Sequence, residues 1–329
     1  MFYRSSNINR SFLRELFVAV FFVSFLSLTF FSCASLRKVD IVVPEDINQQ
    51  LDIKAAPQDK QKEAKEIKII QHTIKVPANQ KEIKARATKM VSKEKLIKNP
   101  FKVGEKIRLD LYYIGIRAAS LVMETMPFVE VNGQKAFHFR GIASTTSLMK
   151  YIYRVYDVID TYVDFANFVP LKMTLKMDES KQNVSMVLIY DHKKGKSTFW
   201  KKRIDAKKNV EEIKKLDDFT PYAQDIFSTL YFVRTHDLKL GDKLKFVVHD
   251  NGKNWNMTIE AVKREKIWTR LGAVETIVLV PTIERDGAVF TKGKLSLWVT
   301  ADERKIPVKF EAEVKFGTMK GIIKDYIAQ

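Results

Sequence analysis

The feature that most constrains the fold is an alternation of apolar and polar side chains, with a period of two, that starts after Phe101. In residues 309–316, every second residue is Lys or Glu. Residues 171–177 and 184–190 repeat the two-residue pattern with apolar residues at every second position. Because successive side chains of a strand point to opposite faces, each run predicts a half-buried antiparallel strand with one solvated face.

Turn signals separate these runs. Asn132-Gly133, Asn251-Gly252 and Asp286-Gly287 each lie between two alternating segments, and such pairs are the strongest short-range indication of a hairpin. We therefore expect about ten to twelve strands joined mostly as hairpins.

One segment, residues 221–234, has helical periodicity instead. Thr220-Pro221 is a suitable N-cap and first-turn pair. Apolar residues then recur at a spacing of 3.6, including Tyr222, Phe227 and Tyr231. The sequence predicts a mainly β fold, a curved antiparallel sheet or incomplete β-barrel with this one helix packed against its concave side. The alternative is two small β-domains joined by an irregular, charged stretch over 201–218.

The first 32 residues have the pattern of a lipoprotein-type signal peptide. Three arginines precede an apolar run over 16–31, which is shorter than the roughly 20 residues that span a bilayer. Cys33, the only cysteine, follows at once, so we expect cleavage before Cys33 and lipidation of its thiol. The alternatives are cleavage after Ala34 or a retained N-terminal helix. All three place the remaining chain outside the cytoplasm.

Residues 33–99 differ in composition from the rest. They are rich in Lys, Glu and Gln and contain no Phe, Trp or Tyr, so they cannot form a core of their own. We expect a basic tether that is dispensable for folding. Residues 80–97 show helical spacing of Ile83, Ala87 and Met90 and are predicted to be partly helical. The alternative is a helix that docks on the folded domain or on a partner.

The search for catalytic chemistry finds no recognised nucleophile, P-loop, zincin or dinucleotide motif. The pairs His236-Asp237 and His249-Asp250 are interpreted as turn and capping residues. His138 is expected on a solvated strand face with Arg140. We therefore expect no catalytic residue, no metal site and no cofactor. Trp298 lies opposite the leucines of its strand and is either a core residue or part of a cavity wall.

The formal net charge of +18 favours anionic partners. For an exported protein these are phospholipid headgroups or acidic glycans, and nucleic acid is not expected. The alternative is that the lysines only solvate exposed strand faces and protect sheet edges.

Several pieces of the sequence resemble the bacterial family catalogued as domain of unknown function 3108, over nearly all of residues 100–329. They are Phe101–Lys106, Pro221–Asp225, Tyr231–Arg234, Leu240–Asp242, the Leu-Gly-x-x-Glu-Thr run around Gly272, Leu297–Asp302, and Arg304–Val308 leading to Phe316-Gly317. The resemblance implies an exported, often lipid-anchored, β-rich domain with no assigned activity, so no catalytic residues carry over. Trp298, Asp302 and the Ile-Pro-Val that follows are also similar to half-barrel lipoprotein carriers of the cell envelope. The long tether is not part of the family pattern.

Together these features predict a cell-envelope protein, anchored through Cys33 at the outer membrane and facing the periplasm. Its expected role is non-enzymatic binding or transfer of an amphipathic or anionic envelope molecule. The expected ligand-binding residues are Tyr222, Phe227, Tyr231 and Trp298. The alternatives are an enzyme acting on envelope glycan or lipid, and a structural tether that binds another envelope protein.

Overall fold

The computed structural model describes residues 39–62, 64–74, 90–285, 288–289, 295–314 and 317–328. Within them, sixteen strands form one sheet in which all strand pairs are antiparallel, in the order β11-β10-β9-β8-β7-β6-β5-β4-β18-β17-β16-β14-β13-β12. Strand β1 pairs with β5, β15 pairs with β14, and β2 and β3 form a separate two-stranded sheet. The predicted signal peptide and Cys33 lie outside the described residues.

The strands of the large sheet are β1 (Ile53–Ala55), β4 (Lys106–Tyr113), β5 (Ile116–Val131), β6 (Gln134–Thr145), β7 (Val155–Asp164), β8 (Pro170–Glu179), β9 (Gln182–Asp191), β10 (Lys196–Asp205), β11 (Val210–Asp218), β12 (Lys243–Asp250), β13 (Lys253–Thr269), β14 (Gly272–Arg285), β15 (Ala288–Val289), β16 (Leu295–Thr300), β17 (Pro307–Glu313) and β18 (Thr318–Ile327). The remaining elements are α2 (Glu45–Asn48), α3 (Ser228–Arg234), the 3₁₀ helices η2 (Gln58–Gln61) and η4 (Met149–Tyr151), β2 (Glu66–Ile74) and β3 (Met90–Lys98). No helix of the described ranges is long and apolar enough to cross a membrane.

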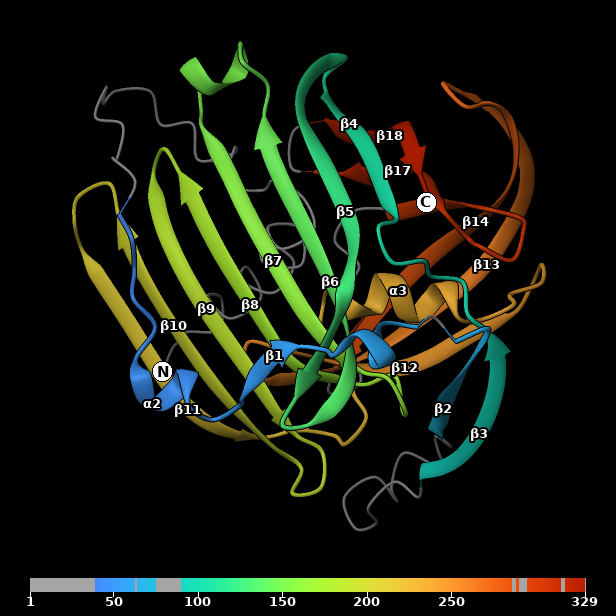
Figure 1. Cartoon of the computed structure of the whole chain (residues 1–329). Coiled ribbons are helices and arrows are strands. Elements are labelled where there is room, and N and C mark those ends of the chain that lie inside the picture. Colours follow the sequence, from blue (N-terminus) through green and yellow to red (C-terminus); the bar gives the residue numbers. More distant parts are fainter. Residues whose placement is uncertain are drawn as a thin grey trace, which may run out of the picture.

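The sheet curves into a barrel that does not close. Its path starts at β11 and ends at β12, and these two strands are not paired in the described part of the chain. In Figure 1, β4 to β11 form one broad wall, β12 to β14 form another, and α3 lies between them. Side chains bridge the two ends of the sheet, because Ser197 Oγ of β10 lies 2.9 Å from His249 Nε2 of β12.

This architecture confirms the predicted fold class, a curved antiparallel sheet with a helix on its concave side. The alternative of two small β-domains is wrong, because a single sheet runs through both halves of the chain. The stretch 201–218, expected to be irregular, belongs to the β10–β11 hairpin, in which Ile204 faces Val210. Alternating charges across this hairpin form ion pairs such as Lys202 with Glu212 at 2.8 Å.

Helix α3 is shorter than the predicted 221–234. It begins at Ser228 because the Asp225 carboxylate accepts the backbone N–H groups of Phe227 and Ser228 at 2.7 and 2.6 Å, which satisfies the free donors of a helix start. Upstream, Tyr222 has a φ of 65°. The N–H of Gln224 bonds to a carbonyl of β12 at 2.9 Å. The first part of the predicted helix is therefore a turn and a strand contact.

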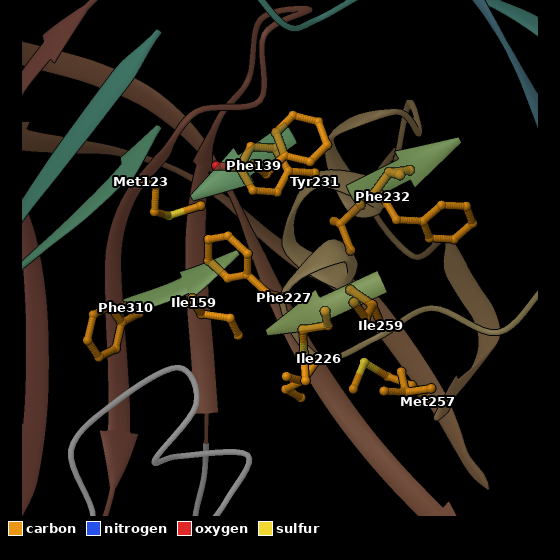
Figure 2. Packing of buried hydrophobic residues seen from close by; sticks show 14 of the residues in the cluster. Met123, Phe139, Ile159, Ile226, Phe227, Tyr231, Phe232, Met257, Ile259 and Phe310 are labelled. Carbon is orange, nitrogen blue, oxygen red and sulfur yellow. The ribbon is translucent and has the colours of Figure 1, made fainter. Parts of the chain in front are cut away.

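The concave side of the sheet is filled with aromatic and aliphatic side chains. Figure 2 shows Phe227 and Tyr231 among Met123, Phe139 and Ile159 of the sheet. The rings of Phe139 and Tyr231 stack with centroids 3.7 Å apart. Both Phe227 and Tyr231 are at most 2% exposed. Burial of such large rings dominates the stability of the interior.

The predicted tether over 33–99 is wrong for much of its length, because it packs on the folded domain. Ile47 of α2 is fully buried against an apolar patch around Trp200 on β9 and β10. Ile67 and Ile69 of β2 belong to the main core. The composition argument failed because this segment needs no core of its own. A few isoleucines can bury their surface against the sheet.

The helix predicted over 80–97 is corrected to a strand from Met90 onward, and its earlier part lies outside the described residues. Met90–Lys98 is β3, which pairs with β2 so that Ile97 faces Ile67. The pairing satisfies the backbone groups of each segment that point toward the other strand. Ile67 and Ile69 lie two residues apart on one buried face, which is the period of a strand.

Candidate functional site

A groove of about 780 Å³ lies at one end of the barrel. It is bordered by the β5–β6, β7–β8 and β9–β10 connections, which an antiparallel meander brings to the same end. The segment before β1 and the turn before α3 complete its wall. The lining residues are Gln50, Leu51, Val131, Asn132, Gln134, Asp164, Asn167, Val169, Leu171, Ile189, Tyr190, Asp191, His192, Lys193, Lys194, Lys196, Thr198, Leu216 and Tyr222.

The lining combines apolar walls with basic side chains. The apolar part comes from separate segments of the chain and includes Leu51, Val131, Leu171 and Ile189. Three lysines of the β9–β10 hairpin, 193, 194 and 196, add positive charge. This division is suited to a molecule with one apolar and one anionic part.

The three lysines differ in their ion pairing. Lys194 lies 3.3 Å from Asp191, and Lys196 lies 2.6 Å from Asp218. Lys193 has no ion pair with any residue that the structure describes. Its ammonium group is therefore the lysine charge of the groove that is most available to an anionic ligand.

His192 holds three segments of the groove together. Its Nε2–H donates to the carbonyl of Pro170 at 2.6 Å, and its Nδ1 accepts the backbone N–H of Tyr222 at 2.9 Å. The ring also packs edge-on against Phe219 with centroids 5.1 Å apart. An acceptor at Nδ1 requires the neutral imidazole. Burial, opposed by the bond to Pro170, lowers the pKa of His192 below its usual 6.5 and favours that form.

The β7–β8 connection is shaped by its own side chains. Asp164 accepts the backbone N–H and the side-chain amide of Asn167 at 2.9 and 2.7 Å, so a local side-chain-to-backbone bond shapes this turn. Phe168 follows with a φ of 54° and a fully buried ring. Its carbonyl accepts Gln224 Nε2 at 3.0 Å. This connection is thereby fixed to the segment that leads into α3.

The structure separates the four predicted ligand-binding residues. Tyr222 lines the groove, beside His192. Phe227 and Tyr231 are packed against each other in the core, with ring centroids 5.6 Å apart, and do not line the groove. Trp298 is buried elsewhere, where its Nε1–H donates to Glu265 at 2.5 Å and Lys309 lies over its ring. Cys33, the predicted lipidation site, lies outside the described residues.

Two histidines that were expected in turns, His236 and His249, are buried in the structure. His249 of β12 is fully buried between Ser197 and Asn254, and burial lowers its pKa. His236, after α3, packs edge-on against Phe232. The expectation that these residues are turn and capping residues underestimated their burial. Ser197, near the other end of the sheet, contacts His249, and Phe232 of α3 contacts His236.

His138 is also buried, although it was expected on a solvated face of its strand. It lies 2.6 Å from Asp160, stacks on Tyr162 and is 9% exposed. Arg140, predicted on the same face, contacts the same carboxylate at 2.7 Å. Side chains of the neighbouring strand β7 cover both residues. The sequence of β6 alone could therefore not predict their burial.

The pair of carboxylates formed by Asp157 and Glu179 lies outside the groove. The pKa of Asp157 is raised well above its usual value, first by burial and then by Glu179, but neither residue lines the groove. Glu179 accepts the hydroxyl of Tyr153 at 2.9 Å. Among the described residues, no three His, Cys, Asp or Glu side chains gather in a way that could hold a metal ion.

The sequence identified the β9–β10 connection only as a turn and missed its contribution to the groove. The signal that could have found it is the run Asp191-His192-Lys193-Lys194-Gly195, which concentrates positive charge beside a histidine. The fold and this groove define a class of protein: an open antiparallel β-barrel with an internal helix and an amphipathic surface groove at one end.

Comparison with family models gives the identity within that class. The chain belongs to the family described as protein of unknown function DUF3108, whose model matches residues 108–324. No curated protein matches the sequence.

The solved structures to which the chain is similar include three bacterial proteins. A β-barrel-like DUF1849 protein from Brucella abortus is 11% identical with a TM-score of 0.41, and covers 68% of this chain and 97% of its own. A protein from Parabacteroides distasonis described as a candidate lipoprotein is 10% identical with a TM-score of 0.31, covering 68% and 95%. A candidate exported protein with a YmcC-like fold from Bacteroides fragilis is 10% identical with a TM-score of 0.31, covering 69% and 97%.

Proposed function

We propose that this protein is a lipid-anchored envelope protein that binds an amphipathic, anionic envelope molecule without transforming it. Its anchor is the acylated Cys33, its location is the outer membrane facing the periplasm, and its ligand site is the groove described above. Of the residues predicted from the sequence, Tyr222 belongs to this site. Phe227 and Tyr231 belong to the core and do not line it.

The observation that carries the proposal is the composition of the groove. Apolar side chains from β8, β9 and the N-terminal segment line it beside the three lysines. An apolar cavity with a few placed polar groups is the usual form of a small-molecule site. A lipid or lipid-linked glycan with an anionic headgroup has the matching division of properties.

The test is native mass spectrometry of the protein purified from the membranes of its own host. We expect a co-purifying anionic amphiphile, and loss of most of it in the Lys193→Glu variant. Lys207→Glu in the β10–β11 turn is the matched control, because it makes the same charge change outside the groove. Equal ligand occupancy in both variants, or no ligand in the native protein, would refute the site.

The anchor is tested separately. Lipidation contributes about 0.8 kcal/mol per buried CH₂, and two or more acyl chains make membrane attachment stable. The Cys33→Ser variant should lose the mass of the lipid and should not be processed as the native chain is. A variant that reaches the same mature mass would exclude Cys33 as the anchor.

A further inference from the structure

Three chain reversals expose large apolar side chains to solvent. We call them the three tips: residues 114–118 at the β4–β5 reversal, residues 146–152 between β6 and β7, and residues 268–271 at the β13–β14 reversal. Their exposed apolar residues, with exposed fractions, are Ile114 68%, Ile116 59%, Leu148 74%, Tyr151 83%, Ile152 67%, Trp268 83% and Leu271 45%.

The three tips lie together. The N–H of Thr146 donates to the carbonyl of Ala118 at 3.0 Å, which joins the first two tips. Asp110 of β4 joins the first and third, since it pairs with Arg117 at 2.7 Å and with Arg270 at 3.6 Å. In Figure 1 the tips lie along the upper edge of the molecule. The first two are at the end of the meander opposite the groove.

The charge of the three tips is positive. None of them contains Asp or Glu, whereas Arg117, Lys150 and Arg270 belong to them. Asp110 is only 2% exposed, so its charge is covered by the two arginines. The ammonium group of Lys150 lies 5.3 Å from the centre of the exposed Tyr151 ring. Exposed apolar side chains beside basic ones are complementary to a membrane with anionic headgroups.

We propose that the three tips form a second membrane contact, separate from both the anchor and the groove, which inserts side chains into the headgroup region of an anionic bilayer. Trp and Tyr favour this region because their rings are apolar and carry a polar edge. A rigid protein partner would have to match three protruding turns. Lipid headgroups are mobile, so a bilayer surface can surround each turn without a matching shape.

The intrinsic fluorescence of the chain makes the proposal testable. Trp268 is 83% exposed, whereas Trp200, Trp255 and Trp298 are at most 8% exposed. Transfer of an indole from water to the membrane interface shifts its emission to shorter wavelength. The spectral change on addition of vesicles therefore reports on Trp268 in the third tip.

The experiment uses the unlipidated chain from Ala34 onward, which contains every described residue. It is mixed with vesicles of phosphatidylcholine, alone or with phosphatidylglycerol. We expect sedimentation with the vesicles and a blue shift that both require phosphatidylglycerol. Acyl-chain bromination should quench the same emission. No blue shift with any vesicle, or self-association in place of vesicle binding, would overturn the proposal.

A variant series distinguishes the tips from general surface hydrophobicity. The triple variant Leu148→Ser, Tyr151→Ser and Trp268→Ser should bind vesicles about tenfold more weakly or worse, because interfacial binding scales with buried apolar area. The control Val42→Ser, Val210→Ser and Leu240→Ser changes side chains that are also at least 60% exposed and should bind normally. Urea unfolding should show both variants folded. Unchanged binding of the folded triple variant would refute the contact.

Discussion

Arg234, in the last turn of α3, and Glu105, just before β4, form a buried ion pair with a distance of 2.6 Å. Their side chains are 1% and 2% exposed. A second bond between the same groups is 2.9 Å long, so the pairing is bidentate. Arg234 also donates to the carbonyl of Arg304 at 3.0 Å, and Tyr326 donates to Glu105 at 3.2 Å. One guanidinium thus joins the helix to the segment before β4 and to the connection between β16 and β17.

The first prediction concerns this ion pair. Glu105→Gln leaves the buried guanidinium of Arg234 without its counter-charge, and we expect a loss of about 3–5 kcal/mol in the free energy of unfolding. Glu303→Gln is the control, because its ion pair with Lys98 has both side chains more than 70% exposed. Its effect should stay within about 1 kcal/mol. Urea denaturation measures both. Similar losses for the two variants would contradict the prediction.

The second prediction concerns the N-terminal segment. Ile69→Ala removes a fully buried side chain of β2 from the main core. We expect a cost of about 2–5 kcal/mol in unfolding free energy. Val42→Ala, at an 81% exposed position of the same segment, should change it by no more than about 0.5 kcal/mol. A chain beginning at Asn99 should melt well below the longer chain. Equal melting temperatures would mean that residues 39–98 are the dispensable tether first expected.

The third prediction concerns close packing between the helix segment and β6. A methyl group added at Gly141 would lie 2.8 Å from Ile159 Cγ2 and 2.8 Å from Phe227 Cζ. Gly141→Ala should therefore cost about 1–3 kcal/mol by overpacking. Phe227→Ala alone should cost about 3–5 kcal/mol through the cavity it leaves.

The double variant provides the control for this contact. If the added methyl group clashes with the ring, Gly141→Ala combined with Phe227→Leu should be less destabilising than the sum of the two single changes. Thermal unfolding of the four proteins gives the coupling. Strict additivity would contradict the contact between Gly141 and Phe227.

The fourth prediction concerns pH. Because the pKa of His192 is lowered in the folded state, the unfolded chain takes up a proton at this residue first as the pH falls below about 6.5. The contribution of His192 to folding is therefore complete above 6.5 and is lost progressively at lower pH. Protonation at Nδ1 also removes the acceptor for the N–H of Tyr222.

The amide nitrogen shift of Tyr222 measures this event by NMR. It should titrate with a midpoint below 6.5, together with the His192 ring signals. His192→Gln should remove that titration. A midpoint at or above 6.5, or an unchanged titration in His192→Gln, would contradict the arrangement around Nδ1.

Local periodicity was sufficient to predict those strands after Phe101 that bury one face, because each shows its core face in its own residues. It failed for β9, which was expected to have a solvated face but is buried on both faces, and for β11, which is largely exposed on both faces and was expected to be irregular. It was insufficient for Met90–Lys98, where spacing compatible with a helix is overridden by pairing with β2. The start of α3 was misplaced for a similar reason. Pro221 is a good first-turn residue, but the backbone of Gln224 is taken by β12.

The groove could not be predicted from local patterns. Leu51, Val131 and Ile189 come from segments far apart in sequence, and nothing in any one of them marks a shared wall. Tyr222 was identified as an apolar member of a helix, yet it lines the groove from a turn with positive φ. Burial of His138 depends on Asp160 and Tyr162 of the neighbouring strand. Such side-chain environments require the tertiary arrangement.

The attachment of α2 to the outer face of β9 and β10 has a mechanical consequence. A pulling force applied to the chain before Val39 first loads the apolar contacts of Ile47 with Val187 and Trp200. Only after these yield does the load reach β1, whose three residue pairs with β5 run from Ile53 to Ala55. The N-terminal segment is thus attached to the sheet at two successive points along the chain, the first through apolar contacts and the second through backbone hydrogen bonds.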